Sequence, residues 1–123
     1  MIVEDDFMVA DLNRQFTESC EGFQVVKIAH TGMEALEFIS STPIDLVVLD
    51  IFLPDIRGTE VLKDIRKSGY PADILLITAA HNADTVEETV RLGVFDYIIK
   101  PFDVARYKES LANYRHYRES LES

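Results

Sequence analysis

Cysteine is nearly absent from this sequence, and long apolar runs and positive charge are scarce. A single cysteine, Cys20, excludes an internal disulfide and a cysteine-rich zinc site. No run of about 18 apolar residues and no signal-peptide pattern occurs, so we expect a cytoplasmic protein without a membrane span. Twelve basic residues against 22 acidic ones give a formal charge of −10. Such a chain repels nucleic-acid phosphates and is better suited to a cation or a basic partner.

The sequence does contain an alternation of short apolar runs with helix-like spacing. Its 123 residues suit one domain. The short runs are typical of parallel strands covered on both faces, and they fall at residues 2–3, 25–29, 46–49, 74–77 and 97–99. Between them apolar residues recur every three or four positions, as at Met8, Leu12 and Phe16. The pattern predicts an α/β fold: a five-stranded parallel sheet of flavodoxin-like order 2-1-3-4-5, doubly wound with five helices.

Local signals indicate where the helices begin and end. Thr31-Gly-Met-Glu34 has the form of a capping box, and Asp84 and Asp103 stand where N-caps are expected. Three helices should stop at glycines, namely Gly22, Gly69 and Gly93. The last helix, from Val104 to about residue 121, would be about 27 Å long at about 1.5 Å per residue. That is longer than a sheet of short strands needs.

Acidic residues stand at the carboxyl ends of two predicted strands. Asp5 and Asp6 follow the first strand, and Asp50 ends the run LVVLD. In doubly wound sheets the ligand site lies at this edge, between strands 1 and 3, so we expect the three carboxylates to converge there. They could be solvated loop ends, a general acid/base pair or a metal site. Oxygen ligands without His or Cys favour a hard cation such as Mg²⁺ or Mn²⁺.

Two further strand ends supply complementary groups. Thr78 closes the run ILLIT, and Lys100 closes the run YIIK. A carboxylate nucleophile, a divalent cation, a hydroxyl donor and an ammonium can together hold a phosphoryl group on Asp50. Taken singly, Thr78 is equally well explained as a strand residue and Lys100 as a surface lysine, but their joint occurrence favours a site.

In this order and spacing, the motifs resemble the receiver domain of two-component response regulators over essentially the whole chain. The matching pieces are the acidic pair Asp5-Asp6 after an apolar strand, Asp50 in LVVLDIFLPDIRG, Thr78 followed by Ala79, and Tyr97 three residues before Lys100-Pro101-Phe102. The resemblance implies a signalling domain that accepts a phosphoryl group on Asp50 from a sensor histidine kinase. It also implies that the domain catalyses its own phosphorylation and dephosphorylation.

The resemblance assigns a role to each site residue. Asp6, Asp50 and the backbone carbonyl of Phe52 would hold Mg²⁺ (or Mn²⁺) directly, and Asp5 would help through water. Thr78 and Lys100 would bind phosphoryl oxygens, and the Lys100-Pro101 bond is expected to be cis. Thr78 and Tyr97 would form the switch, since an inward turn of the threonine leaves space for the tyrosine ring. That movement would alter the surface of the fourth helix, fifth strand and last helix, where a homodimer could also form.

Finer similarity points to the receivers of citrate and C4-dicarboxylate sensing regulators. It is carried by VEDDFMVADLN and by TAAHNADTVEETVRLGVFDYIIKPF. Those regulators carry a DNA-binding domain after the receiver, which these 123 residues do not include. We therefore expect residues 1–115 to be the receiver domain and residues 116–123 to be the extended end of the last helix, leading to a linker. The output would be control of transcription by that further domain.

Phe52 stands two residues past the nucleophile. Its carbonyl can serve the metal whatever the side chain, but a large apolar ring could crowd the path of attacking water. We therefore expect slow loss of phosphate from Asp50. The ring could instead pack against the kinase or against a neighbouring loop.

Three other functions are compatible with parts of the pattern. A phosphatase of the haloacid dehalogenase type usually has a second acid two residues after the nucleophile, where this chain has Phe52. A flavodoxin-like electron carrier is disfavoured because Glu4, Asp5 and Asp6 would repel a flavin phosphate. The third alternative is a receiver-like interaction module that works without phosphorylation. The complete set of predicted site residues favours a phosphoacceptor over this module.

Overall fold

The computed structural model describes residues 1–79 and 83–122, and it confirms the predicted α/β fold. Within these residues five parallel strands form one sheet of order β2-β1-β3-β4-β5. The strands are β1 (Ile2–Val3), β2 (Ile28–Ala29), β3 (Leu46–Asp50), β4 (Asp73–Thr78) and β5 (Asp96–Ile99). The helices that alternate with them are α1 (Phe7–Glu18), α2 (Gly32–Ser41), α3 (Gly58–Lys67), α4 (Ala83–Arg91) and α5 (Val104–Glu122).

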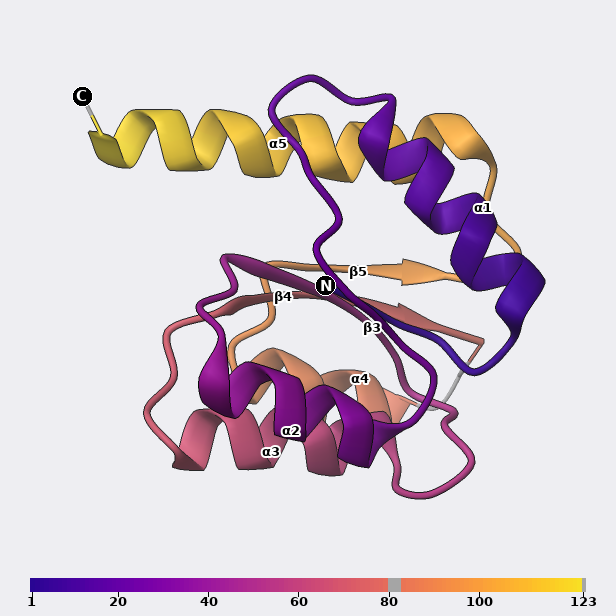
Figure 1. Ribbon diagram of the computed structural model, residues 1–123, viewed down its shortest axis with the longest axis vertical. Helices are drawn as coiled ribbons and strands as arrows, with labels where there is room; N and C mark the ends of the chain where they lie inside the picture. Colours follow the sequence, from indigo (N-terminus) through magenta and orange to yellow (C-terminus); the bar gives the residue numbers. More distant parts are fainter. Residues whose placement is uncertain (80–82, 123) are drawn as a thin grey trace.

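Helices cover both faces of the sheet (Figure 1). Helices α1 and α5 pack on one face, and α2, α3 and α4 pack on the other. Each face has its own apolar core, and all five residues of β3 are buried between the two. This double burial explains why β3 and β4 are solid apolar runs rather than alternating ones.

Strand β2 is shorter than the apolar run 25–29 predicted, so the prediction is wrong for residues 25–27. The ladder with β1 pairs Ile28 with Ile2 and Ala29 with Val3. As an edge strand, β2 has one partner, and that partner has two residues. Val26 therefore lies outside the ladder and is 52% exposed.

Most of the predicted helix ends are confirmed. Thr31 Oγ1 accepts the N–H of Glu34 at 3.1 Å, whereas the Glu34 carboxylate accepts from the N–H of His30, one residue outside an ordinary capping box. Asp103 caps α5 by accepting the N–H of Arg106 at 2.8 Å. Gly69 and Gly93 follow the ends of α3 and α4 with φ of 76° and 82°, which glycine adopts without strain. The predicted stop at Gly22 is wrong, because α1 already ends at Glu18 with Ser19 as its C-cap.

Helix α4 begins and ends differently from the other helices. It begins at Ala83, so Asp84 lies in its first turn rather than before it, and the side chain of Asp84 lies outside the described residues. At the other end, Arg66 of α3 donates to the carbonyl oxygens of Leu92 and Gly93 at 3.0 and 2.8 Å. The guanidinium thereby holds the two residues that directly follow α4.

Helix α5 is anchored along its first half and then extends beyond the sheet (Figure 1). Tyr107, Leu111 and Tyr114 are buried, and the Tyr107 hydroxyl lies 2.9 Å from Thr17 Oγ1 of α1. The apolar stripe is not buried to its end, since Leu121 is 64% exposed. Among the described residues, no helix combines the length and apolarity that a membrane span requires.

Candidate functional site

Three carboxylates meet at the carboxyl edge of the sheet. Ligand oxygens of Glu4, Asp5 and Asp50 all lie within 4.8 Å of one another. They are brought together because β1 ends at Val3, β3 ends at Asp50, and these two strands are neighbours. Glu4 and Asp50 are 3% and 4% exposed, whereas Asp5 faces solvent. A group of carboxylate oxygens without His or Cys suits Mg²⁺ or Mn²⁺.

Asp6 lies outside this group, which differs from the expected ligand set. Its Oδ1 accepts the N–H groups of Met8 and Val9 at 2.9 and 3.1 Å, so Asp6 is the N-cap of α1. An acid directly before the first helical residue is placed to satisfy the unpaired N–H groups of that helix. The pair that accompanies Asp50 is therefore Glu4 and Asp5, one position earlier than the sequence analysis placed it.

Lys100 brings a cation to the same site. Its Nζ lies 2.8 Å from Oδ2 of Asp50 and 3.3 Å from Oε1 of Glu4. The backbone N–H of Lys100 donates to the carbonyl of Thr78 at 2.8 Å, and the Lys100–Pro101 peptide bond is cis. Thr78 is the buried last residue of β4. Because β4 lies between β3 and β5, the Lys100 side chain spans the end of β4 to reach Asp50.

The charges of the site are unbalanced. Burial, together with the neighbouring Asp5 and Asp50, raises the pKa of Glu4 to about 7, although the hydrogen bond from the N–H of Asp6 acts in the opposite direction. Partial burial alone would lower the pKa of Lys100, but its contacts with Asp50 and Glu4 hold that pKa above the ordinary value. One ammonium thus faces three carboxyl groups, and a divalent cation would offset the remaining repulsion.

The comparisons with known proteins agree with this geometry. A family model, the response regulator receiver domain, matches residues 1–112. The chain belongs to the response regulator receiver domain family. Its relatives include "Probable C4-dicarboxylate response regulator DctR" of Priestia megaterium, 39% identical over 98% of this chain, and "Transcriptional regulatory protein DcuR" of Escherichia coli K12, 38% identical over 99%. These alignments cover 53% and 52% of the relatives, so the chain spans about half of their length.

Solved structures show the same receiver fold. The response regulatory domain of protein mrkE from Klebsiella pneumoniae has a TM-score of 0.88 and 26% identity, with 97% of this chain and 96% of that chain covered. A CheY-like receiver domain from Methanospirillum hungatei has a TM-score of 0.87 and 29% identity, with 97% and 94% covered. The similarity therefore extends over nearly the whole receiver domain.

Phe52 lies beside Asp50, whereas Tyr97 lies on β5, which β4 separates from β3. The N–H of Phe52 donates to Oδ1 of Asp50 at 3.0 Å, and the residue is 50% exposed beside the acceptor. Tyr97 lies on β5, partly buried against the core of the α2, α3 and α4 face. Arg106 of α5 donates to the Tyr97 carbonyl at 3.1 Å.

Sequence reasoning missed Asp55, in the segment between β3 and α3. Its carboxylate accepts the N–H groups of Gly32 and Met33 at 2.8 and 2.9 Å, at the start of α2. Although desolvation acts in the opposite direction, these N–H groups hold the pKa of Asp55 below its ordinary value. The contact joins residues 23 positions apart, and no local motif signals it.

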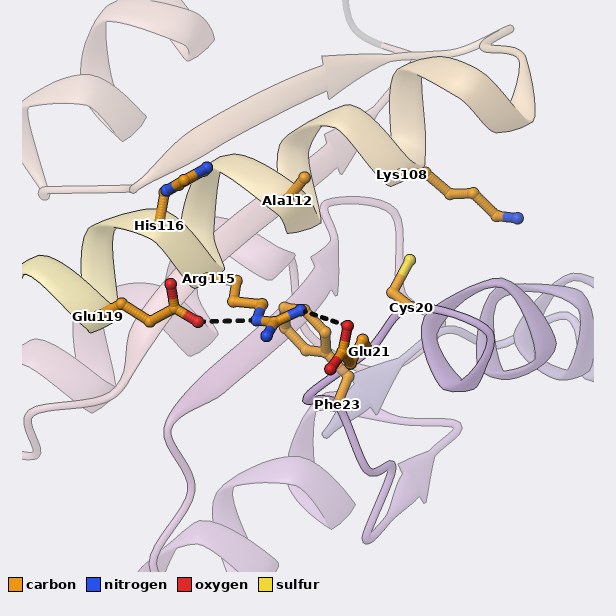
Figure 2. A pocket seen from close by; sticks show the side chains of 8 residues that line it. All are labelled: Cys20, Glu21, Phe23, Lys108, Ala112, Arg115, His116 and Glu119. Carbon is orange, nitrogen blue, oxygen red and sulfur yellow. Dashed lines mark hydrogen bonds and ion pairs between the residues drawn. The ribbon is translucent and has the colours of Figure 1, made fainter.

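A hollow of about 500 Å³ lies away from the acidic edge, between the segment after α1 and helix α5 (Figure 2). Eight residues line it: Cys20, Glu21, Phe23, Lys108, Ala112, Arg115, His116 and Glu119. Arg115 pairs with Glu21 at 3.2 Å and with Glu119 at 2.9 Å. Because Arg115 is already paired with two carboxylates, this hollow is a weaker candidate for a ligand-binding site than the acidic edge of the receiver.

Proposed function

We propose that this receiver domain accepts a phosphoryl group on Asp50 in a reaction that requires Mg²⁺ or Mn²⁺. The observation that carries the proposal is the Lys100 ammonium 2.8 Å from the Asp50 carboxylate, inside a group of three converging carboxylates. An aspartate that is 4% exposed yet placed at the open edge of a sheet is unusual for a solvated loop end. Membership of the receiver family supports the same chemistry.

The donor set suits a hard divalent cation. Glu4, Asp5 and Asp50 would supply carboxylate oxygens, and the backbone carbonyl of Phe52 would supply another. When bound, such an ion offsets the negative charge that collects around a transferred phosphoryl group. Asp6 contributes indirectly, because as the N-cap it fixes the start of α1 next to Asp5.

The residues of the chain perform the rest of the transfer. An oxygen of Asp50 attacks the phosphorus of a phosphohistidine donor, the donor P–N bond breaks, and the imidazole leaves with the bonding electron pair. The Lys100 ammonium, already beside Asp50, is placed to take a phosphoryl oxygen as a partner. The hydroxyl of Thr78, at the end of β4, would donate a hydrogen bond to another phosphoryl oxygen.

Movements of the Thr78 and Tyr97 side chains would transmit phosphorylation of Asp50 to the surface of the domain. In this proposal Thr78 turns toward the phosphoryl group and the Tyr97 ring moves into the space beside it, which changes the surface of α4, β5 and α5. The partly buried position of Tyr97 supports the idea, since the core does not enclose the whole side chain. A Tyr97 side chain with the same orientation in phosphorylated and bare protein would rule this switch out.

The partners follow from the family and from the relatives. We propose that a sensor histidine kinase supplies the phosphoryl group in the cytoplasm, and that the output is transcription, as the name of DcuR suggests. Residues 1–115 would be the receiver domain, and residues 116–123 would lead into a linker and a DNA-binding domain. A homodimer would form through α4, β5 and α5. The receiver acts as a signalling domain that catalyses its own modification.

The proposal is tested by mass spectrometry of the intact chain. We expect incubation with acetyl phosphate and Mg²⁺ to add one phosphoryl group to the wild type. The variant Asp50→Asn should gain none, because it lacks the nucleophile, and removal of the metal with EDTA should have the same effect on the wild type. Equal mass gain in both proteins would place the modification elsewhere and contradict the proposal.

A further inference from the structure

The segment between β3 and α3, residues 51–57, is closed at its base next to Asp50. The N–H of Gly58 donates to the carbonyl of Ile51 at 2.7 Å. A Cβ on Gly58 would lie 2.4 Å from the carbonyl oxygen of Asp50 and 2.6 Å from Cα of Ile51, so only glycine permits this approach. The two ends of the segment are therefore held together next to the backbone of Asp50.

The far part of the segment is held by the start of α2. Asp55 accepts two N–H groups there, from Gly32 at 2.8 Å and from Met33 at 2.9 Å. Ile56 packs over the same place, since a Cβ on Gly32 would lie 2.4 Å from Cγ1 of Ile56. Two hydrogen bonds and one apolar contact thus hold residues 55 and 56 against the first turn of α2.

That point of α2 is itself fixed to the acidic edge. Nδ1 of His30, just before the helix, lies 3.0 Å from the carbonyl oxygen of Glu4. The His30 ring also stacks on Phe7 of α1, with ring centroids 3.8 Å apart. Asp55 therefore connects the segment that carries Phe52 to a support that is anchored beside Glu4.

We propose that Asp55 is a positioning residue for the divalent-cation site, because it holds residues 51–57 so that Phe52 keeps its place beside Asp50. The inference rests on the proposed function. Phe52 matters twice: its N–H holds Oδ1 of Asp50 at 3.0 Å, and its carbonyl is the proposed backbone ligand. Asp55 itself lies outside the group of three carboxylates, so its removal leaves every side-chain ligand in place.

Thr31 offers a matched control. Its Oγ1 also accepts an N–H at the start of α2, from Glu34 at 3.1 Å, but within the described part of the chain no hydrogen bond joins it to residues 51–57. Both Asp55→Ala and Thr31→Ala remove capping of the same helix, and both should lower the melting temperature. They differ in that only Asp55→Ala releases the segment that carries Phe52.

The test measures Mn²⁺ binding by the whole 123-residue chain, from the electron paramagnetic resonance signal of free Mn²⁺. We expect Asp55→Ala to raise the Kd for Mn²⁺ on the order of tenfold, as loss of an outer partner of a metal ligand does. Thr31→Ala should bind Mn²⁺ like the wild type. Asp55→Asn, which retains one acceptor oxygen, should fall between Asp55→Ala and the wild type.

Each outcome has a separate meaning. Wild-type Kd values in Asp55→Ala, together with a melting temperature lowered as much as in Thr31→Ala, would show that Asp55 only caps α2 and would overturn the inference. Equal weakening of Mn²⁺ binding in both variants would overturn it as well, because α2 and not the segment would then be responsible. A wild type that neither binds Mn²⁺ nor takes up a phosphoryl group would instead contradict the proposed function, and this inference with it.

Discussion

Nζ of Lys100 lies 2.8 Å from Oδ2 of Asp50, across 50 positions of sequence. The contact joins the end of β3 to the residue after β5 over the strand between them. It gives the buried Asp50 carboxylate a cationic partner before any phosphoryl group arrives. The same pair marks where the incoming group must enter, since a phosphoryl group on Asp50 would come between these two side chains or beside them.

Asp5 and Asp6 should differ sharply in their effect on metal binding. Asp6→Ala removes the two N-cap bonds of α1 and should lower the free energy of unfolding by about 1 kcal/mol without changing the response to Mg²⁺. Asp5→Ala should largely abolish the rise in melting temperature that Mg²⁺ causes, because the ion stabilises only the folded state. Thermal melts with and without Mg²⁺ measure both effects. If Asp6→Ala alone lost the Mg²⁺ response, Asp6 would be a metal ligand, as expected from the sequence.

Glu4 should make the metal-free protein less stable as the pH rises. Its pKa is raised from 4.5 to about 7 in the folded state, so between these values the folded chain holds a proton that the unfolded chain releases. The free energy of unfolding therefore falls as the pH rises through this window, and the full penalty is present above pH 7. At pH 8 in EDTA, Glu4→Gln should be more stable than the wild type by about 1–3 kcal/mol.

Urea unfolding at pH 8 and pH 4 measures that difference. At pH 4 the glutamate is protonated in the folded state, so the variant should gain little. The glutamine keeps an acceptor oxygen for the N–H of Asp6, which limits other changes. A gain of the same size at both pH values would mean that ionisation of Glu4 is not its cause.

Phe52 should lengthen the life of the phosphoryl group on Asp50. The residue is half exposed beside the acceptor, where an apolar ring obstructs the approach of water. We expect Phe52→Asn to shorten the half-life several-fold, measured by loss of the phosphorylated mass after the donor is removed. The control is Val104→Asn, which replaces an exposed apolar residue away from the site, on α5. This variant should leave the half-life unchanged. An unaltered half-life in Phe52→Asn would favour a packing role for the ring.

Tyr114 should stabilise the fold without affecting phosphorylation. Its hydroxyl donates to Oδ2 of Asp73 at 2.7 Å and accepts from Arg118 at 3.1 Å, at the end of the sheet opposite the acidic site. Tyr114→Phe should lower the free energy of unfolding by about 1 kcal/mol. Urea unfolding and the acetyl phosphate assay together check this. A large drop in phosphorylation would show that the two ends of the receiver are coupled.

The strand order and the N-caps Thr31 and Asp103 could be predicted because the forces behind them are local or periodic. Because β3 and β4 are buried on both faces, successive residues in these strands are apolar, and the runs are visible in the sequence. The same rule failed at β2, because Val26 is apolar but lies at an exposed edge where a two-residue ladder gives it no partner. Apolar composition alone does not distinguish these cases.

Composition could not predict which two of the acids Glu4, Asp5 and Asp6 lie beside Asp50. Three acids lie between the last residue of β1 and the first residue of α1, and each can be a cap or a ligand. The position of the helix start decides: Asp6, directly before Phe7, becomes the cap, and Glu4 and Asp5 remain for the site. Asp55 was missed for a different reason, since it meets its partners Gly32 and Met33 only when the segment before α3 folds against the start of α2.

The most direct measurement is a crystal structure of the chain with Mg²⁺ and beryllofluoride, a stable analogue of the phosphoryl group. We predict that the analogue is bonded to a carboxylate oxygen of Asp50, with Lys100 Nζ beside one fluorine and Mg²⁺ next to the oxygens of Asp5 and Asp50. Beryllofluoride on another side chain, or Mg²⁺ bound away from the Glu4, Asp5 and Asp50 group, would contradict the account.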